Sequence, residues 1–232
     1  MNIAKRSLTA VLAVLIIGAA VVPAIAQDIE KPEPVVPEVF TLVGEFVRMA
    51  YNNEGFVTLG YRVANDSVAE EWMLLELGLT LRQGVKNQTF TRDDISLQLP
   101  DGSTIGMASQ EAFNKANLRG LDRRASVVRD SINYFPASVN LPCRIGFFTD
   151  ASQPGRGLAY DQVDLNWQKA CVGRVYFQIP DGITTGQYYL NVKFANSVVQ
   201  VPFRILTKAE EKKFRKQWKD IKKEHDAEYK EE

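Results

Sequence analysis

Residues 73–82, MLLELGLTLR, decide the fold class of this chain. Apolar residues occupy every second position, and Glu76, Thr80 and Arg82 fall between them. Successive side chains of a strand point to opposite faces of its sheet, so this alternation is typical of a strand with one buried face. We predict that the leucines of this strand face a core and that the polar residues between them face solvent.

Shorter runs with the same period flank this strand. Residues 56–64 alternate and predict a second strand, which ends at the turn-forming residues 65–67, Asn-Asp-Ser. Two later runs each lead into a Pro-Asp-Gly sequence, at 100–102 and at 180–182, where proline and glycine favour a tight turn.

The strongest predicted hairpin joins residues 188–194 to residues 199–205 through a turn at Asn196 and Ser197. Pro202 lies in its second strand and predicts an edge strand or a bulge, because proline cannot donate a hydrogen bond to a neighbouring strand. Together these runs predict a mainly β fold, an antiparallel β-sandwich over residues 39–206.

Two stretches interrupt the alternation, residues 106–142 and residues 149–160. Connections of this length are uncommon and often functional, so we expect a binding surface there. In the first insertion, Ser109 predicts the N-cap of a short helix over residues 110–117. The basic residues that follow form either a local anion-attracting patch or a solvated face: Arg119, Arg123, Arg124 and Arg129.

The C-terminal residues 207–232 contain no Gly or Pro and are dominated by Lys and Glu, which predicts a charged helix. Phe214, Trp218 and Ile221 are spaced by four and three residues, so they form one stripe of that helix, which His225 continues. The stripe either docks on the sandwich or binds a partner. We therefore treat Phe214, Trp218 and Ile221 as candidate partner-binding residues.

The N-terminus has the pattern of a secretory signal peptide over residues 1–26. Lys5 and Arg6 precede an apolar segment, and the small residues Ala24 and Ala26 form a cleavage pattern. Residues 27–38 contain three prolines and predict an extended linker. We expect an exported product, periplasmic or extracellular and of bacterial type, with no stable membrane insertion after cleavage.

Composition narrows the classes of function. Removing Lys5 and Arg6 from the 28 basic residues leaves 26 against 28 acidic ones, a near balance that argues against a nucleic-acid binder. The two cysteines, Cys143 and Cys171, predict a structural disulfide in an exported protein, with a stabilisation of roughly 3 to 4 kcal/mol.

The inventory of reactive side chains predicts no catalytic, cofactor or metal site. The one histidine, His225, lies in the charged tail, where nothing nearby is placed to assist it. Asp161 and Asp164, near Trp167, could contribute to a calcium or sugar site, although no calcium-loop spacing accompanies them. A hydrolase that uses carboxylates stays open as a third class of function.

Three stretches resemble immunoglobulin-like domains of bacterial secreted proteins and lipoproteins. Residues 55–65, GFVTLGYRVAN, are similar to an early strand of those domains. Residues 173–180 resemble a late strand, and residues 186–190, GQYYL, resemble the start of a penultimate strand. The resemblance covers about half of the chain after residue 26. It implies an immunoglobulin-like sandwich that acts as an extracellular interaction module without catalysis.

We therefore expect an exported, non-catalytic interaction or structural protein of the bacterial envelope or secretome, with a protein partner or a second copy of itself. The alternative is a small-ligand or carbohydrate-binding β-sandwich module that uses residues 149–167.

The cysteine pairing yields a first prediction. Alkylation of the freshly exported protein without reductant should leave its intact mass unchanged, because neither Cys143 nor Cys171 carries a free thiol. Mass spectrometry measures this directly, and two alkylated cysteines would overturn the disulfide.

Overall fold

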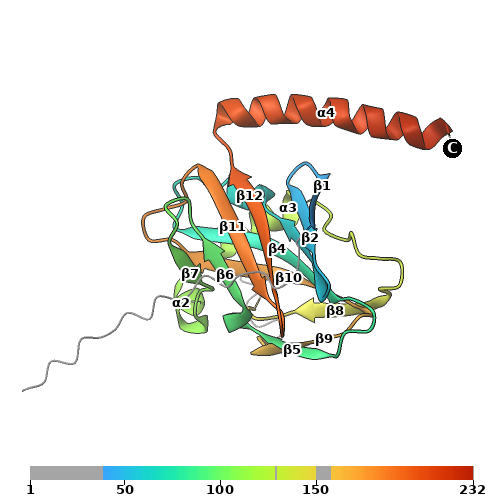
Figure 1. Ribbon diagram of the computed structural model, residues 1–232. Helices are drawn as coiled ribbons and strands as arrows, with labels where there is room; N and C mark the ends of the chain where they lie inside the picture. Colours follow the sequence, from blue (N-terminus) through green and yellow to red (C-terminus); the bar gives the residue numbers. More distant parts are fainter. Residues whose placement is uncertain (1–38, 129, 150–157, 232) are drawn as a thin grey trace, which may run out of the picture. The chain divides into compact units, whose positions relative to one another are not determined.

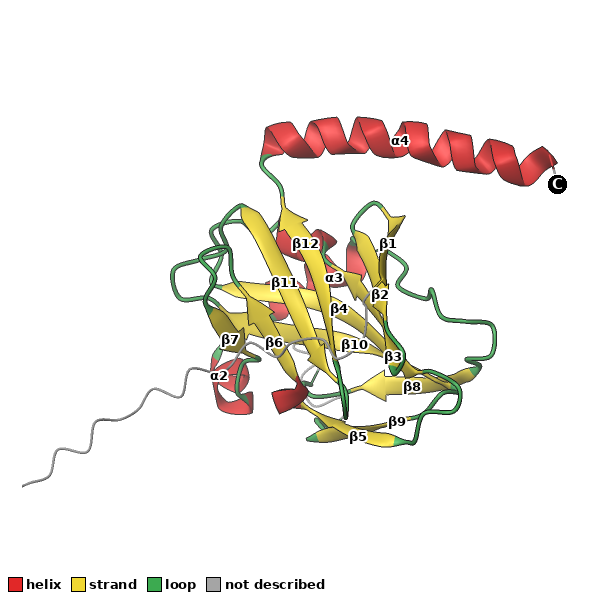
Figure 2. Ribbon diagram, in the orientation of Figure 1, coloured by secondary structure: helices red, strands yellow, loops and turns green. Residues whose placement is uncertain are grey.

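The computed structural model describes residues 39–128, 130–149 and 158–231, with side chains from Gly44 to Asp220 and at Lys223. The predicted signal peptide and linker lie outside the described residues. Two sheets face each other across one apolar core (Figure 1, Figure 2), so the predicted mainly β sandwich is confirmed.

The large sheet has six strands in the order β1-β2-β3-β4-β10-β8. β4 and β10, the two longest strands, pair in the interior of the sheet, and β1 and β8 form its edges. The six strands are β1 (Val39–Gly44), β2 (Val47–Tyr51), β3 (Gly55–Gly60), β4 (Trp72–Leu81), β8 (Leu141–Ile145) and β10 (Lys169–Gln178).

The small sheet has the order β12-β11-β6-β7 and lies in front of β4 and β10 in Figure 2. A separate two-stranded sheet, β5-β9, follows at one end. The bounds are β5 (Gln88–Thr91), the 3-10 turn η1 (Arg92–Asp94), β6 (Ile95–Gln98), β7 (Thr104–Gly106), β9 (Gln162–Leu165), β11 (Gly186–Lys193) and β12 (Val198–Ile205).

The predicted hairpin and corners are confirmed. β11 and β12 pair antiparallel in continuous register, and β12, which contains Pro202, is an edge strand of its sheet. At the two Pro-Asp-Gly corners, the N–H groups of Gly102 and Gly182 donate to carbonyl groups three residues earlier, at 3.0 and 2.9 Å. Both glycines have positive φ, +88° and +81°, which a side chain would disfavour.

The strand predicted over residues 56–64 is wrong beyond Gly60. The chain instead makes one helical turn, α1 (Arg62–Asn65), which buries Val63 and Ala64. One helical turn can bury two apolar residues as well as a strand does. The apolar pattern over so few residues therefore could not distinguish a helical turn from the end of a strand. The buried Asn65 amide oxygen then accepts a hydrogen bond from the backbone N–H of Leu206 at 2.7 Å.

β4 is buried on both faces, so the prediction of a single buried face is wrong. Leu74 and Thr80, on the face expected in solvent, are 1% and 0% exposed. The insertion covers this outer face with α2 (Gln110–Lys115), α3 (Arg119–Val127) and the loop after α3. The ring of Phe135 fills the space over Gly78, where an added Cβ atom would lie 2.8 Å from its Cζ.

The insertion packs through aromatic rings and one buried carboxylate. The ring of Tyr176, on β10, lies 5.0 Å from the rings of Phe113 and Phe148. Its hydroxyl donates to the carboxylate of Asp122 on α3, which also accepts from Nη1 of Arg174 at 3.2 Å. The predicted helix after Ser109 is confirmed as α2, and Ser109 accepts from the N–H of Ala112 at 3.0 Å; α3 was not predicted.

β8 departs from the predicted antiparallel arrangement, because it runs parallel to β10. The chain passes through β9 between these two strands, so it returns in the same direction. Cys143 on β8 lies directly opposite Cys171 on β10 in this register, and the predicted disulfide between them is confirmed. It joins the edge strand β8 to its neighbour β10.

The buried carboxylate of Asp122 yields a second prediction. Asp122→Ala should lower the free energy of unfolding by about 3 kcal/mol, because Arg174 and Tyr176 lose a buried charged partner. Urea denaturation measures the change. Asp93→Ala removes an exposed carboxylate and should change the stability by less than about 0.5 kcal/mol. Equal urea midpoints for the two variants would contradict this role of Asp122.

Candidate functional site: an outer-face cavity and an anchored helix

A cavity of about 730 Å³ lies on the outer face of the large sheet. β8 and β10 form its floor, and the insertion forms its walls through Ser126 and residues 130–133, with Phe148 and Thr149 at a further side. This volume is within the range of small-molecule sites. The cavity exists because the insertion covers the part of the outer face over β4 but leaves part of β8 and β10 open.

The floor of the cavity follows from the register of the strands. Arg144 lies opposite Val172, and Arg174 lies opposite Glu76. Side chains that alternate along a strand share a face, so these residues point to the outer side, away from the sandwich core. Arg174 also donates to Ser126 Oγ at 3.1 Å, which joins the floor to one wall.

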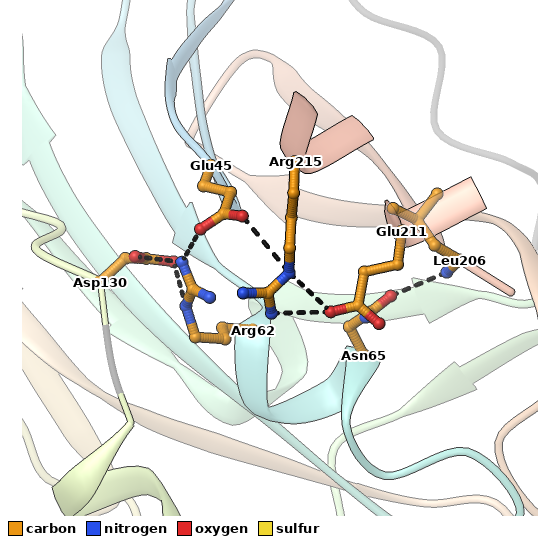
Figure 3. Close-up of polar contacts among 7 residues, drawn as sticks. All are labelled: Glu45, Arg62, Asn65, Asp130, Leu206, Glu211 and Arg215. Carbon is orange, nitrogen blue, oxygen red and sulfur yellow. Dashed lines mark hydrogen bonds and ion pairs between the residues drawn. The ribbon is translucent and has the colours of Figure 1, made fainter. Parts of the chain in front are cut away.

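A chain of charges connects the cavity wall to the C-terminal helix (Figure 3). Asp130, which lines the cavity, accepts hydrogen bonds from Nε and Nη2 of Arg62 at 2.9 and 2.8 Å. The same guanidinium lies 2.5 Å from Glu45, and Glu45 lies 3.5 Å from Nε of Arg215 on the helix. Arg215 is also paired with Glu211, at 2.7 Å.

Arg62 is the centre of this chain of charges. Burial by itself would lower the pKa of Arg62, but hydrogen bonds to Asp130 and Glu45 outweigh that effect and raise it above its ordinary value. The guanidinium also lies over the ring of Phe46, at 4.6 Å from its centroid. Arg62 therefore stays charged and ties the insertion to the turn between β1 and β2.

The C-terminal helix, α4 (Lys208–Glu231), confirms the predicted charged helix and begins at a capping box. The N–H of Glu210 donates to Thr207 Oγ1 at 3.2 Å, and the N–H of Thr207 donates back to the Glu210 carboxylate at 2.9 Å. Such reciprocal bonds satisfy backbone donors that a helix start leaves open. Arg204 of β12 also pairs with Glu210, at 2.8 Å.

The first turns of α4 dock on the sandwich. The ring of Phe214 lies 5.7 Å from the ring of Phe46, which is fully buried, and Arg215 lies over the same ring at 5.8 Å. Trp218 is half-buried. Phe214 therefore packs on the core, whereas the side chain of Ile221 lies outside the described residues. Whether Phe214, Trp218 and Ile221 bind a partner stays a prediction.

Three of the four arginines of the predicted patch lie in the described residues. Arg124 pairs with Glu70 at 2.6 Å, and its Nη2 donates to Ser67 Oγ at 2.9 Å. Arg119 and Arg123 are exposed on α3, and Arg129 lies outside the described residues. Arg124 thus fixes α3 to the chain after α1.

The carboxylates considered for calcium or sugar binding lie apart from the cavity. Asp164 is on β9 and accepts from Thr89 at 3.1 Å, while Asp161 is exposed and Trp167 packs against the core. Among the described residues, no group of three or more His, Cys, Asp or Glu side chains is placed to hold a metal ion.

In the same part of the chain, no helix has the length and apolar character needed to cross a bilayer. His225 is in α4, and its side chain lies outside the described set.

The sequence did not reveal the cavity, because its residues come from segments far apart in the chain. Thr149 and the insertion belong to regions that we expected to bind, but the contribution of β8 and β10 depends on register. No protein-family model, curated protein or solved structure matches this chain.

The capping box yields a third prediction. Hydrogen bonds from the Thr207 backbone and from Arg204 lower the pKa of Glu210 from its ordinary 4.5 to about 2. A lowered pKa means that the carboxylate supports the start of α4 above pH 4.5 and that this support is lost as the pH falls to about 2. NMR titration of the Thr207 amide should show this midpoint, and Glu210→Gln should abolish it. A midpoint near 4.5 would contradict the capping box.

Proposed function

We propose that this chain is an exported, non-catalytic interaction protein of the bacterial envelope or secretome, and that α4 presents a recognition surface. The signal-peptide pattern supports export, and the disulfide suits an oxidising compartment. The resemblance to immunoglobulin-like modules of secreted proteins supports an interaction role. The partner is a protein or a second copy of the chain.

One observation carries this proposal: α4 is anchored near its start and continues well beyond the anchor. Its polar and aromatic contacts with the sandwich, among the described side chains, come from residues 210–215. A helix of 24 residues is about 36 Å long. Residues 216–231 therefore form a helix that a partner can cover, with Trp218 at the boundary between anchor and extension.

The experiment is in-cell crosslinking and affinity capture with the full protein and with a variant that ends at Leu206. We expect a partner that the full protein captures and the shortened variant loses. Trp218→Asp should weaken capture, because it places a charge in the apolar stripe, and Lys219→Asp should have little effect, because Lys219 is exposed. Equal capture by the full and shortened proteins would assign recognition to the sandwich instead.

A second candidate function, a ligand-binding β-sandwich module, is favoured by the outer-face cavity. Its volume and its mixed apolar and polar lining are those of a small-molecule site. Thr149 belongs to this lining, whereas Asp161, Asp164 and Trp167 do not. The module would therefore use the floor formed by β8 and β10 rather than the whole of residues 149–167.

A further inference from the structure

The geometry points to a specific ligand class for the outer-face cavity: a small carboxylic acid with an apolar body, whose carboxylate is bound by Arg144. The inference deepens the ligand-binding candidate above, and it does not depend on α4 or on a protein partner.

The charged side chains of the lining differ in how they are paired. Arg174 is engaged by Asp122, and Asp130 is engaged by Arg62. Glu76 faces Arg174 across the β4–β10 pair. Arg144 is exposed at the other side of the floor and has no carboxylate partner among the described residues. Arg144 is therefore the basic side chain of the lining that is open to a ligand, and an arginine binds a carboxylate through two parallel hydrogen bonds.

An apolar surface lies beside Arg144 in the floor of the cavity. Val172, directly opposite Arg144 in the register, is 37% exposed in the floor, and Pro142 and Ala170 continue the same lining. Val172 is the large apolar side chain of the lining that stays exposed. Exposed apolar surface inside a partly polar cavity is typical of a binding site.

Tyr160 lies next to the position of Arg144. Its N–H donates to the carbonyl of Gly146 at 2.7 Å, and its ring covers Gly146 while staying 51% exposed. An added Cβ at Gly146 would lie 2.9 Å from that ring and 3.5 Å from Nε of Arg144. The guanidinium and an exposed aromatic ring thus flank one glycine beside the cavity. Arg144 belongs to the cavity lining, whereas Tyr160 and Gly146 lie outside it.

The lining disfavours a neutral sugar as the ligand. Sugars commonly stack on an exposed aromatic face, but the two rings that line the cavity, Phe148 and Tyr176, are 4% and 1% exposed, and the exposed ring of Tyr160 lies outside the lining. Both pack against Phe113 of α2. The open part of the floor is aliphatic, which suits a hydrocarbon chain better than a pyranose ring.

The test uses octanoate as the acid and octan-1-ol as its uncharged counterpart, with binding followed by titration calorimetry and by amide chemical shifts. We expect octanoate to bind and to shift the amides of Val172 and Ser131. Arg144→Gln should weaken octanoate binding roughly ten- to a hundredfold, the effect of losing one charge-assisted hydrogen bond. Val172→Asp should abolish it, and Arg123→Gln, an exposed arginine outside the cavity, should leave it unchanged.

The outcomes separate the ligand class from the cavity itself. If octan-1-ol binds as tightly as octanoate and Val172→Asp abolishes both, the cavity binds ligands but the assignment of a carboxylic acid is overturned. An unchanged affinity in Arg144→Gln overturns the role of Arg144. If neither compound shifts the cavity amides of the folded protein, the inference fails, and the proposal for α4 is unaffected.

Discussion

The carboxylate of Asp122 lies fully buried between α3 and the outer face of the large sheet, where Tyr176 and Arg174 replace the water that it loses. A charged group is tolerated at such a position when hydrogen-bonding partners surround it. This contact holds the insertion on β10. Three other features depend on the insertion being held there. They are the covering of β4, the walls of the cavity and the position of Asp130 beside Arg62.

A second group of contacts organises the end of the sandwich from which α4 leaves. The ring of Phe46 lies under two guanidinium groups, those of Arg62 and Arg215, and against the ring of Phe214. The carboxylate of Glu45 lies between the same two arginines. Aromatic packing and charge pairing thus involve the same few residues. The insertion, the turn between β1 and β2, and α4 are joined by one polar network beside the buried ring of Phe46.

The sequence predicted those features that depend on local pattern. Alternation located β4, β11 and β12, the Pro-Asp-Gly sequences located two corners, and Ser109 located α2. It could not show that β4 is buried on both faces, because the outer face is covered by segments far along the chain, by Phe135 of the insertion at Gly78 and by the Asn166 carbonyl at Thr80. The single turn of α1 was mistaken for the end of a strand. The sequence did not indicate Arg144 as a candidate binding residue, because its place in the cavity depends on the strand register that sets it opposite Val172.

The disulfide has a consequence for how the chain responds to proteolysis. Cys143 and Cys171 are 28 residues apart, and their strands lie side by side. A cut at any peptide bond between them leaves two fragments that remain one covalent molecule, with β8 still attached to β10. Limited digestion in this segment would pass unnoticed on a non-reducing gel and appear as two bands after reduction.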